Sequence, residues 1–247
     1  MATDLPLIVP EWPAPRNVRA FATTRNGGVS AGPYASLNLG THVGDDPQAV
    51  AENRARLGRH LPVRPLWLQQ VHGAVVVNAL STCPDAQADA AFARVPNQIC
   101  TVMTADCLPV LFCDASGTAV GVAHAGWRGL AGGVLENTVK AMQVEATEVL
   151  AWLGPAIGPQ SFEVGEDVRT AFVAHSAQAQ SAFVPTGAPG KYLADLYLLA
   201  RQRLTALGVT RIYGGGRCTL TEADIFFSAR RDGTRSGRQA SLIWLEG

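Results

Sequence analysis

Charged side chains and long apolar runs are both scarce in this chain of 247 residues. Only 16% of the residues are charged, and 20 Lys and Arg balance 20 Asp and Glu, so the formal net charge is zero. This balance predicts no electrostatic attraction to nucleic acid and no polybasic membrane patch. The longest apolar runs fall far short of the ~20 residues that a membrane-spanning helix needs. We therefore expect neither a nucleic-acid partner nor membrane association.

Close cysteine pairs and a signal segment are missing as well. The five cysteines stand at positions 83, 100, 107, 113 and 218, without a C-x-x-C pair. Residues 1–15 contain no basic run followed by an apolar run, which a secretory signal peptide would have. These features favour reduced thiols and a cytoplasmic location over a secreted protein with a disulfide framework.

What the chain does have is a hydrophobic content of 47%, which is typical of a compact globular protein. We expect one α+β domain over residues 1–247, with an extended N-terminal segment at 1–15. Hydrophobic periodicity predicts strands at 18–23, 66–71, 74–78, 99–103, 110–113, 118–123, 149–153, 211–213 and 241–245. It predicts helices at 47–57, 130–142, 165–174 and 194–207, with Asp46 and Asp195 as N-caps. Residues 174–190 are rich in small residues, Pro and Gly, and are expected to form a surface loop.

Three short motifs concentrate metal-binding residue types at the ends of apolar runs. They are QVHG at 70–73, ADCLP at 105–109 and HAGWRG at 124–129. Their histidines and cysteine, His72, Cys107 and His124, make three ligands, one fewer than a closed structural zinc site uses. Three protein ligands leave a position for water or substrate, so the motifs predict a catalytic zinc site.

The same residues allow a chemistry without metal. Cys107 can act as a thiolate nucleophile with His124 as its base, as in cysteine hydrolases. That dyad leaves His72 without a role, so we favour the metal interpretation. Asp106 is a candidate catalytic acid or base, as is Glu163. Asp106 is equally well explained as a turn residue or as a partner of a metal ligand.

Anion-binding features follow the third motif. The glycine turn at 124–129 leads into a predicted helix, whose N-terminus and Arg128 together suit phosphate or carboxylate. A plain glycine turn with Arg128 on the surface is an equally good interpretation. Arg25 and Arg230 are candidate second contacts to phosphate. Asn38 can hydrogen-bond a sugar or a base edge, and it can equally serve a turn. Each of these arginines alone is more often structural than functional.

Several of these motifs together resemble the bacterial laccase-domain family. The similarity covers residues 24–30 (TRNGGVS), 70–73, 105–109, 124–129, 153–158 (LGPAIG), 226–231 (FFSARR) and 243–245. Members are known as polyphenol oxidase-like proteins, zinc-dependent purine nucleoside phosphorylases and peptidoglycan editing factors. The resemblance implies zinc held by His72, Cys107 and His124. It also implies a single-domain α/β/β/α sandwich with mixed sheets, related to the cysteine-hydrolase fold of deamidating toxins.

The activities implied by the resemblance are phosphorolysis of adenosine, inosine and methylthioadenosine, with adenosine deamination in addition. Purine nucleoside and phosphate would then be the substrates, and we leave the oligomeric state open. The alternative is a cysteine or zinc hydrolase that edits muropeptide precursors. Copper polyphenol oxidase is least favoured, because five histidines without a His-x-His pair cannot build a trinuclear copper cluster. A single copper ion can still bind at the three ligands in vitro.

Overall fold

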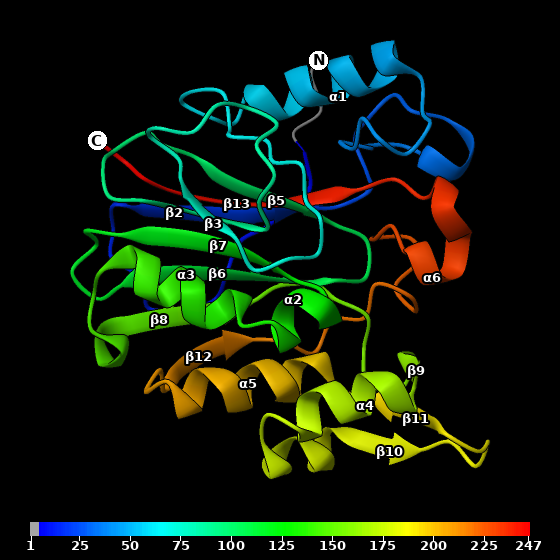
Figure 1. The fold of residues 1–247 in the computed structure, drawn as a ribbon. Helices are drawn as coiled ribbons and strands as arrows, with labels where there is room; N and C mark the ends of the chain where they lie inside the picture. The colour runs from blue at the N-terminus through cyan, green and yellow to red at the C-terminus, as the bar shows by residue number, and fades with distance from the viewer. Residues whose placement is uncertain (1–4) are drawn as a thin grey trace.

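Helices cover the outer faces of two stacked sheets, giving the four layers that Figure 1 shows in a computed structural model describing residues 5–247. Helix α1 (Pro47–Gly58) lies over one sheet. Helices α2 (Trp127–Ala131), α3 (Val134–Met142) and α5 (Leu196–Ala206) lie over the other. The predicted α+β sandwich with mixed sheets is therefore confirmed.

The sheet under α1 has four antiparallel strands in the order β1-β2-β13-β5. They are β1 (Leu7–Ile8), β2 (Val18–Thr23), β13 (Gln239–Leu245) and β5 (Cys100–Thr104). The second sheet has six strands in the order β12-β8-β6-β7-β4-β3, parallel at both edge pairs and antiparallel between them. They are β12 (Arg211–Gly214), β8 (Val149–Leu153), β6 (Leu108–Asp114), β7 (Val120–Ala125), β4 (Ala90–Ala93) and β3 (Val76–Asn78).

The remaining elements are a small third sheet and several short helices. A three-stranded sheet is formed by β10 (Phe183–Pro185), β11 (Lys191–Ala194) and β9 (Glu163–Gly165), which precedes helix α4 (Glu166–Val173). Helix α6 (Ala229–Asp232) begins after Ser228, whose side chain accepts a hydrogen bond from the Arg231 N–H. Short 3-10 helices are η1 (Gly32–Tyr34), η2 (Ala146–Glu148), η3 (Ala177–Ala182) and η4 (Gly233–Arg235).

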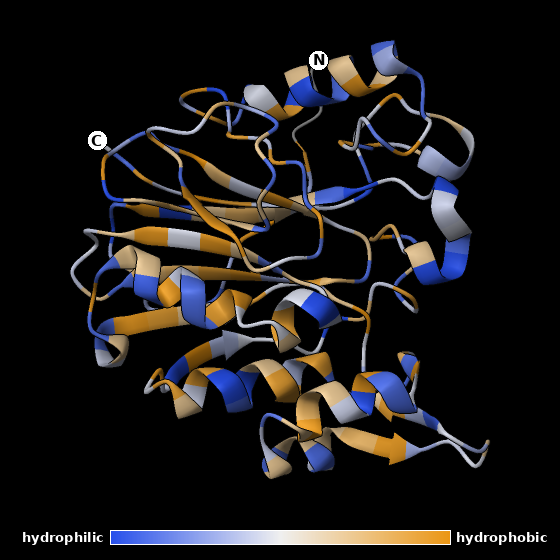
Figure 2. Cartoon of the chain, viewed as in Figure 1, coloured by the Kyte–Doolittle hydropathy of each residue, from blue (hydrophilic) through white to orange (hydrophobic). Residues whose placement is uncertain are grey.

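Strand β6 shows why the central strands read as unbroken apolar runs. All seven of its residues are buried. Alternate side chains of a strand point to opposite faces, so Val110 and Phe112 pack towards the helices while Leu111 and Cys113 pack between the sheets. A third cluster, which includes Leu37 and Leu57, fills the space under α1. Figure 2 shows the resulting apolar strands between helices whose outer faces are polar.

Several local predictions are confirmed. Helices α1, α4 and α5 lie where periodicity placed them, and the Asp46 and Asp195 side chains accept hydrogen bonds from the first-turn N–H groups of Gln48 and Leu198. Within residues 5–247, no helix is long and apolar enough to cross a bilayer.

Other local predictions are wrong. The helix predicted at 130–142 is divided into α2 and α3, because Gly133 adopts a left-handed backbone conformation with φ of 91° and begins the second helix. Residues 66–71 form only isolated bridges instead of a strand. The expected loop at 174–190 contains η3 and β10, and β4 was not predicted.

Candidate metal centre

The three predicted ligands meet at one end of the second sheet. The ligand atoms of His72, Cys107 and His124 all lie within 4.8 Å of one another, an arrangement that can hold a metal ion. The Cys107 sulfur lies 3.9 Å from His72 Nε2. His124 is in β7 and Cys107 directly precedes β6, and the antiparallel pairing of these strands brings the two residues together. His72 comes from the loop that precedes β3.

A buried carboxylate that sequence reasoning missed organises both histidines. Asp89 is 0% exposed, and its Oδ1 lies 2.8 Å from His124 Nδ1. The same side chain accepts hydrogen bonds from the backbone N–H groups of Val71, His72 and Gly73 at 3.2, 2.9 and 2.7 Å. This contact to Nδ1 leaves Nε2 of His124 for a metal. The available signal was a lone acid among the alanines at 88, 90 and 91. A carboxylate in such a setting is rarely buried unless it is paired.

The loop backbone at His72 is held in an uncommon conformation. His72 has φ of 60°, in the left-handed region that costs energy for a residue with a Cβ. The three N–H groups bound by Asp89 include that of His72 and those of its two neighbours. Asp89 therefore fixes this loop in the conformation that presents the His72 ring to Cys107.

A missing side chain at Gly126 makes room for the cluster. A Cβ at this position would lie 2.8 Å from the Cys107 sulfur and 3.2 Å from His72 Cδ2. Gly126 is also the N-cap of α2, directly after β7. Glycine is thus required here because a larger residue would displace a ligand.

The cluster is arranged so that its sulfur is ionised. Burial alone would raise the pKa of Cys107, but the charge and hydrogen bonds of His124 and His72 lower it to about 6. Burial opposes protonation of His124, yet the Cys107 thiolate and Asp89 raise its pKa to about 9. The thiolate is the form of cysteine that binds metals and attacks electrophiles. The site therefore has the reactive form of its sulfur available at neutral pH.

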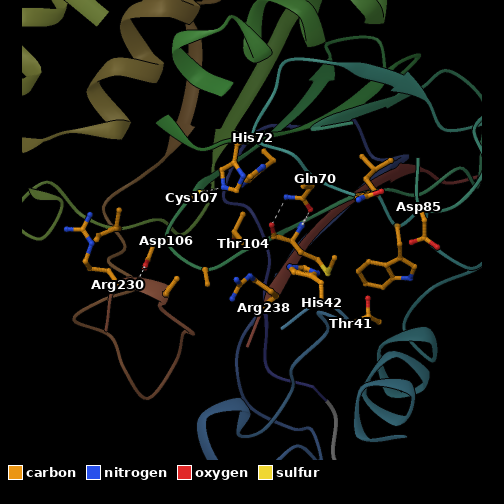
Figure 3. A pocket seen from close by; sticks show the side chains of 18 of the residues that line it. Thr41, His42, Gln70, His72, Asp85, Thr104, Asp106, Cys107, Arg230 and Arg238 are labelled. Carbon is orange, nitrogen blue, oxygen red and sulfur yellow. Dashed lines mark hydrogen bonds between the residues drawn. The ribbon is translucent and has the colours of Figure 1, made fainter. Parts of the chain in front are cut away.

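This cluster opens into a cavity of about 820 Å³. Figure 3 shows the cavity with Asp106 and Arg230 on one side, His42, Thr41 and Asp85 on the other, and Arg238 between them. The further lining residues include the aromatic side chains of Trp67 and Phe162. The volume and the mixed lining suit a polar ligand with a flat ring.

Asp106, a predicted catalytic residue, lies in the cavity wall next to Cys107. Its two carboxylate oxygens accept hydrogen bonds at 2.6 Å from the Thr219 hydroxyl and from the Arg230 backbone N–H. These contacts fix the side chain firmly. Its part in catalysis stays a prediction.

The predicted substrate contacts divide into two groups. Among the described residues that line the cavity, Arg230 is present and Arg25, Asn38 and Arg128 are not. Arg230 donates a hydrogen bond to the Glu163 carbonyl oxygen. Arg128 is exposed and lies 4.5 Å from the Trp127 ring centre.

The two remaining candidates make contacts within the protein. Arg25 donates to the carbonyl oxygens of Ala35 and Ala223 at 2.8 Å. Asn38 is 0% exposed, and its Oδ1 accepts from the backbone N–H of Arg238 at 2.9 Å. Arg238, which lines the cavity, was missed by sequence reasoning.

Comparison with known proteins identifies the family to which the chain belongs. Residues 19–246 match the sequence model of a family described as multi-copper polyphenol oxidoreductase laccase. This match spans most of the chain. The chain belongs to this laccase-like family.

Relatives in the family carry a different functional name. The chain is 59% identical to a purine nucleoside phosphorylase of Pseudomonas aeruginosa over 97% of this chain and 98% of that protein. It is 57% identical to the purine nucleoside phosphorylase YfiH of Escherichia coli over 97% and 98% of the two chains. The crystal structure of the Neisseria meningitidis protein NMB0706 superposes with a TM-score of 0.92 at 56% identity, covering 98% of this chain and 99% of that one.

Proposed function

We propose that the chain is a zinc-dependent purine nucleoside phosphorylase. It would cleave adenosine, inosine and methylthioadenosine with phosphate to the free base and ribose 1-phosphate or its methylthio analogue. The observation that carries this proposal is the His72–Cys107–His124 cluster at the wall of a cavity of about 820 Å³. The proposal is also supported by the Pseudomonas aeruginosa relative, which is 59% identical to this chain and is named a purine nucleoside phosphorylase.

The donor set suits zinc. One thiolate and two imidazoles are borderline-soft ligands, and three protein ligands are the number that catalytic zinc sites use. The contact between Asp89 and His124 Nδ1, at 2.8 Å, is the outer support that metal-binding histidines usually have. A zinc ion held here would act as a Lewis acid, favouring the anionic form of a bound oxygen ligand.

The residues of the cavity would divide the work of phosphorolysis. A phosphate oxygen attacks C1′ of the ribose, and the bond from C1′ to the base nitrogen breaks with its electron pair leaving on the base. Positive charge develops on the sugar during this exchange. Asp106, fixed by Thr219 and the Arg230 backbone, supplies a carboxylate in the cavity wall to stabilise that charge. Arg230 would contact the substrate from the same side.

Adenosine deamination would use the same cavity as a side activity, with water in place of phosphate. The attacked atom is then C6 of adenine, and the products are inosine and ammonia. Because the two reactions share one cavity, substitution of Cys107 should remove both.

The decisive experiment is adenosine turnover by metal-quantified protein with and without phosphate. We expect adenine and ribose 1-phosphate only when phosphate is present, and neither product from the Cys107→Ala variant. Inosine as the sole product would make the protein a deaminase instead. Neither product from protein with one zinc per chain would refute the proposal for nucleosides.

A specific observation favours a cysteine hydrolase as the second candidate. The nucleophile would be Cys107, its base His124 and the orienting carboxylate Asp89. The Asp89 Oδ1 lies 2.8 Å from His124 Nδ1. Such an enzyme would cleave an amide bond of a muropeptide precursor using water. It would stay active after chelation of the metal and without phosphate, and alkylation of Cys107 would stop it.

A further inference from the structure

Arg238 is a cation in the cavity wall, and its guanidinium has no carboxylate partner in the described part of the chain. It precedes β13, and within residues 5–247 no ion pair is formed by its guanidinium. Its side-chain hydrogen bonds, to the carbonyl oxygens of Ser236 and Gly237 at 2.7 and 3.0 Å, use Nη1 alone. Nε and Nη2 make no hydrogen bond to the described residues and are left for a ligand. Burial lowers the pKa of Arg238, as expected for a guanidinium that has lost part of its hydration.

A second observation comes from Thr104, at the end of β5. Thr104 is 2% exposed and lines the cavity, and its hydroxyl has no hydrogen-bond partner among the described residues. Thr104 pairs with Gln239, the first residue of β13, so Arg238, directly before that strand, lies near the end of β5 that carries Thr104. A buried hydroxyl without a partner is costly, and in native proteins it usually marks an unseen ligand or water.

Contacts with Asn38 and Gly40 fix the position of Arg238. Its backbone N–H donates to Asn38 Oδ1 at 2.9 Å, and the Asn38 amide nitrogen donates to the Gly40 carbonyl and to Asp45. A Cβ at Gly40 would lie 2.8 Å from Arg238 Cγ, so this glycine lets the arginine stem pass. The fully buried Asn38, one of the substrate-contact candidates from the sequence, thus acts as a positioning residue for Arg238.

The guanidinium also lies close to the reacting groups. Its charge interacts with those of Cys107 and Asp106, and together with Arg54 it lowers the pKa of His42, an effect secondary to burial of that ring. Figure 3 shows Arg238 between Asp106 and His42, on the side of the cavity opposite His72. An anion bound to Arg238 would therefore share the cavity with the metal ligands. Arg230, by comparison, is exposed and already donates to the Glu163 carbonyl.

We infer that Arg238 and Thr104 form the binding site for the phosphate that attacks the nucleoside. The inference rests on the proposed phosphorylase function. The planar guanidinium can donate two parallel hydrogen bonds to phosphate oxygens, and the Thr104 hydroxyl can donate a third. Arg128, the anchor expected from the sequence, is exposed and outside the described lining of the cavity.

The test is the phosphate dependence of adenosine phosphorolysis in the zinc-loaded, full-length protein. Loss of charge-assisted hydrogen bonds in Arg238→Gln should raise the KM for phosphate by about 30-fold or more, and Thr104→Val should raise it by roughly fivefold. The KM for adenosine should change by less than about twofold, which a general loss of structure would not allow. Arg238→Lys should recover part of the phosphate affinity, because it restores the charge without the fork. Arg59→Gln, at an exposed arginine directly after α1, is the matched control and should behave as the parent.

Direct binding of inorganic phosphate, measured by calorimetry on the same proteins, separates this inference from the function on which it rests. Weaker phosphate binding by Arg238→Gln and Thr104→Val supports the site even if the parent protein does not turn over adenosine. Unchanged phosphate affinity in both variants would overturn it. A raised phosphate KM in Arg128→Gln with no change in Arg238→Gln would also overturn it and return the anchor to the helix start. Thr104→Val, nearly isosteric with the parent residue, keeps the test valid if Arg238→Gln fails to fold.

Discussion

Replacing Asp89 with asparagine should weaken metal binding while leaving the three ligands in place. The Asp89 carboxylate uses both of its oxygens: Oδ1 contacts His124 Nδ1 and the His72 N–H, and Oδ2 accepts from Val71 and Gly73. Asparagine keeps an oxygen at one of these two positions and places an amide N–H₂ at the other, where it faces hydrogen-bond donors that it cannot accept from. Two of the four contacts are therefore lost, whichever way the amide is oriented.

The size of the effect follows from these contacts. A hydrogen bond to a charged group contributes about 1.5–3 kcal/mol, so two of them predict a loss of about 3–6 kcal/mol in the free energy of unfolding. For a chain of this length, each kcal/mol lowers Tm by roughly 2–4 °C. Loss of the carboxylate behind a metal-binding histidine typically weakens metal affinity by about 10–100-fold. The Asp89→Asn variant should thus show both effects.

A matched control separates the two effects. Asp114 is also a buried aspartate, 4% exposed, and it accepts hydrogen bonds from the Thr118 N–H and hydroxyl and the Ala119 N–H at the far end of β6. Asp114→Asn should lower Tm in the same way without changing zinc affinity. The assay is zinc competition against a chromophoric chelator, with thermal unfolding of the apo and zinc-loaded proteins.

One result would refute this reasoning. If Asp89→Asn binds zinc within about twofold of the parent, Asp89 does not orient the ligands, and its contacts serve the fold alone. If Asp114→Asn weakens zinc binding equally, the effect reflects general destabilisation.

Three further predictions follow from the same geometry. Gly126→Ala should weaken zinc binding by about tenfold or more, because its Cβ would lie 2.8 Å from the Cys107 sulfur; Gly58→Ala, whose Cβ would meet open space, should not. In metal-free protein, the rate at which iodoacetamide alkylates Cys107, followed by peptide mass spectrometry, should rise with pH through a midpoint near the Cys107 pKa of about 6 and then level off. Burial is the chief cause that raises the pKa of Cys113 to about 12, so Cys113 should stay unmodified at neutral pH. A midpoint near 9 for Cys107 would contradict the thiolate–imidazolium pair. Tyr197→Phe should lower the free energy of unfolding by about 1–3 kcal/mol in chemical denaturation, since its hydroxyl accepts from the Ala156 N–H and reaches the Gly154 and Arg217 carbonyls.

Much of the fold could be predicted from local pattern alone. Strands such as β6 are buried on both faces, and their apolar runs are short and bounded by turn residues. The false strand at 66–71 has a physical cause. Leu66 and Leu68 pack into the cluster between the sheets while Trp67 packs into the cluster under α1. The apolar run there reflects burial on two sides without a hydrogen-bonded partner strand.

The candidate site could be predicted only in part. His72, Cys107 and His124 each lie at one end of an apolar run and within two residues of a glycine or proline, so their chemistry and position are both visible in the sequence. Arg238 carries no local mark, and the lone acid at Asp89 among alanines indicates a buried carboxylate without indicating its partner. Asp89 acquires its role from His124, 35 positions away, and Arg238 is positioned by Asn38, 200 positions away. Such contacts depend on the tertiary fold, which local patterns do not specify.

The central claim is that phosphate attacks the nucleoside sugar in the cavity beside the His72–Cys107–His124 cluster. The most direct test is turnover of adenosine by zinc-loaded protein with phosphate in which every oxygen is ¹⁸O. The mass of the sugar product is then measured by mass spectrometry. Attack by a phosphate oxygen on C1′ predicts ribose 1-phosphate that retains all of the labelled oxygens, and no product from Cys107→Ala. Loss of one labelled oxygen, or free ribose or inosine in place of ribose 1-phosphate, would contradict the account.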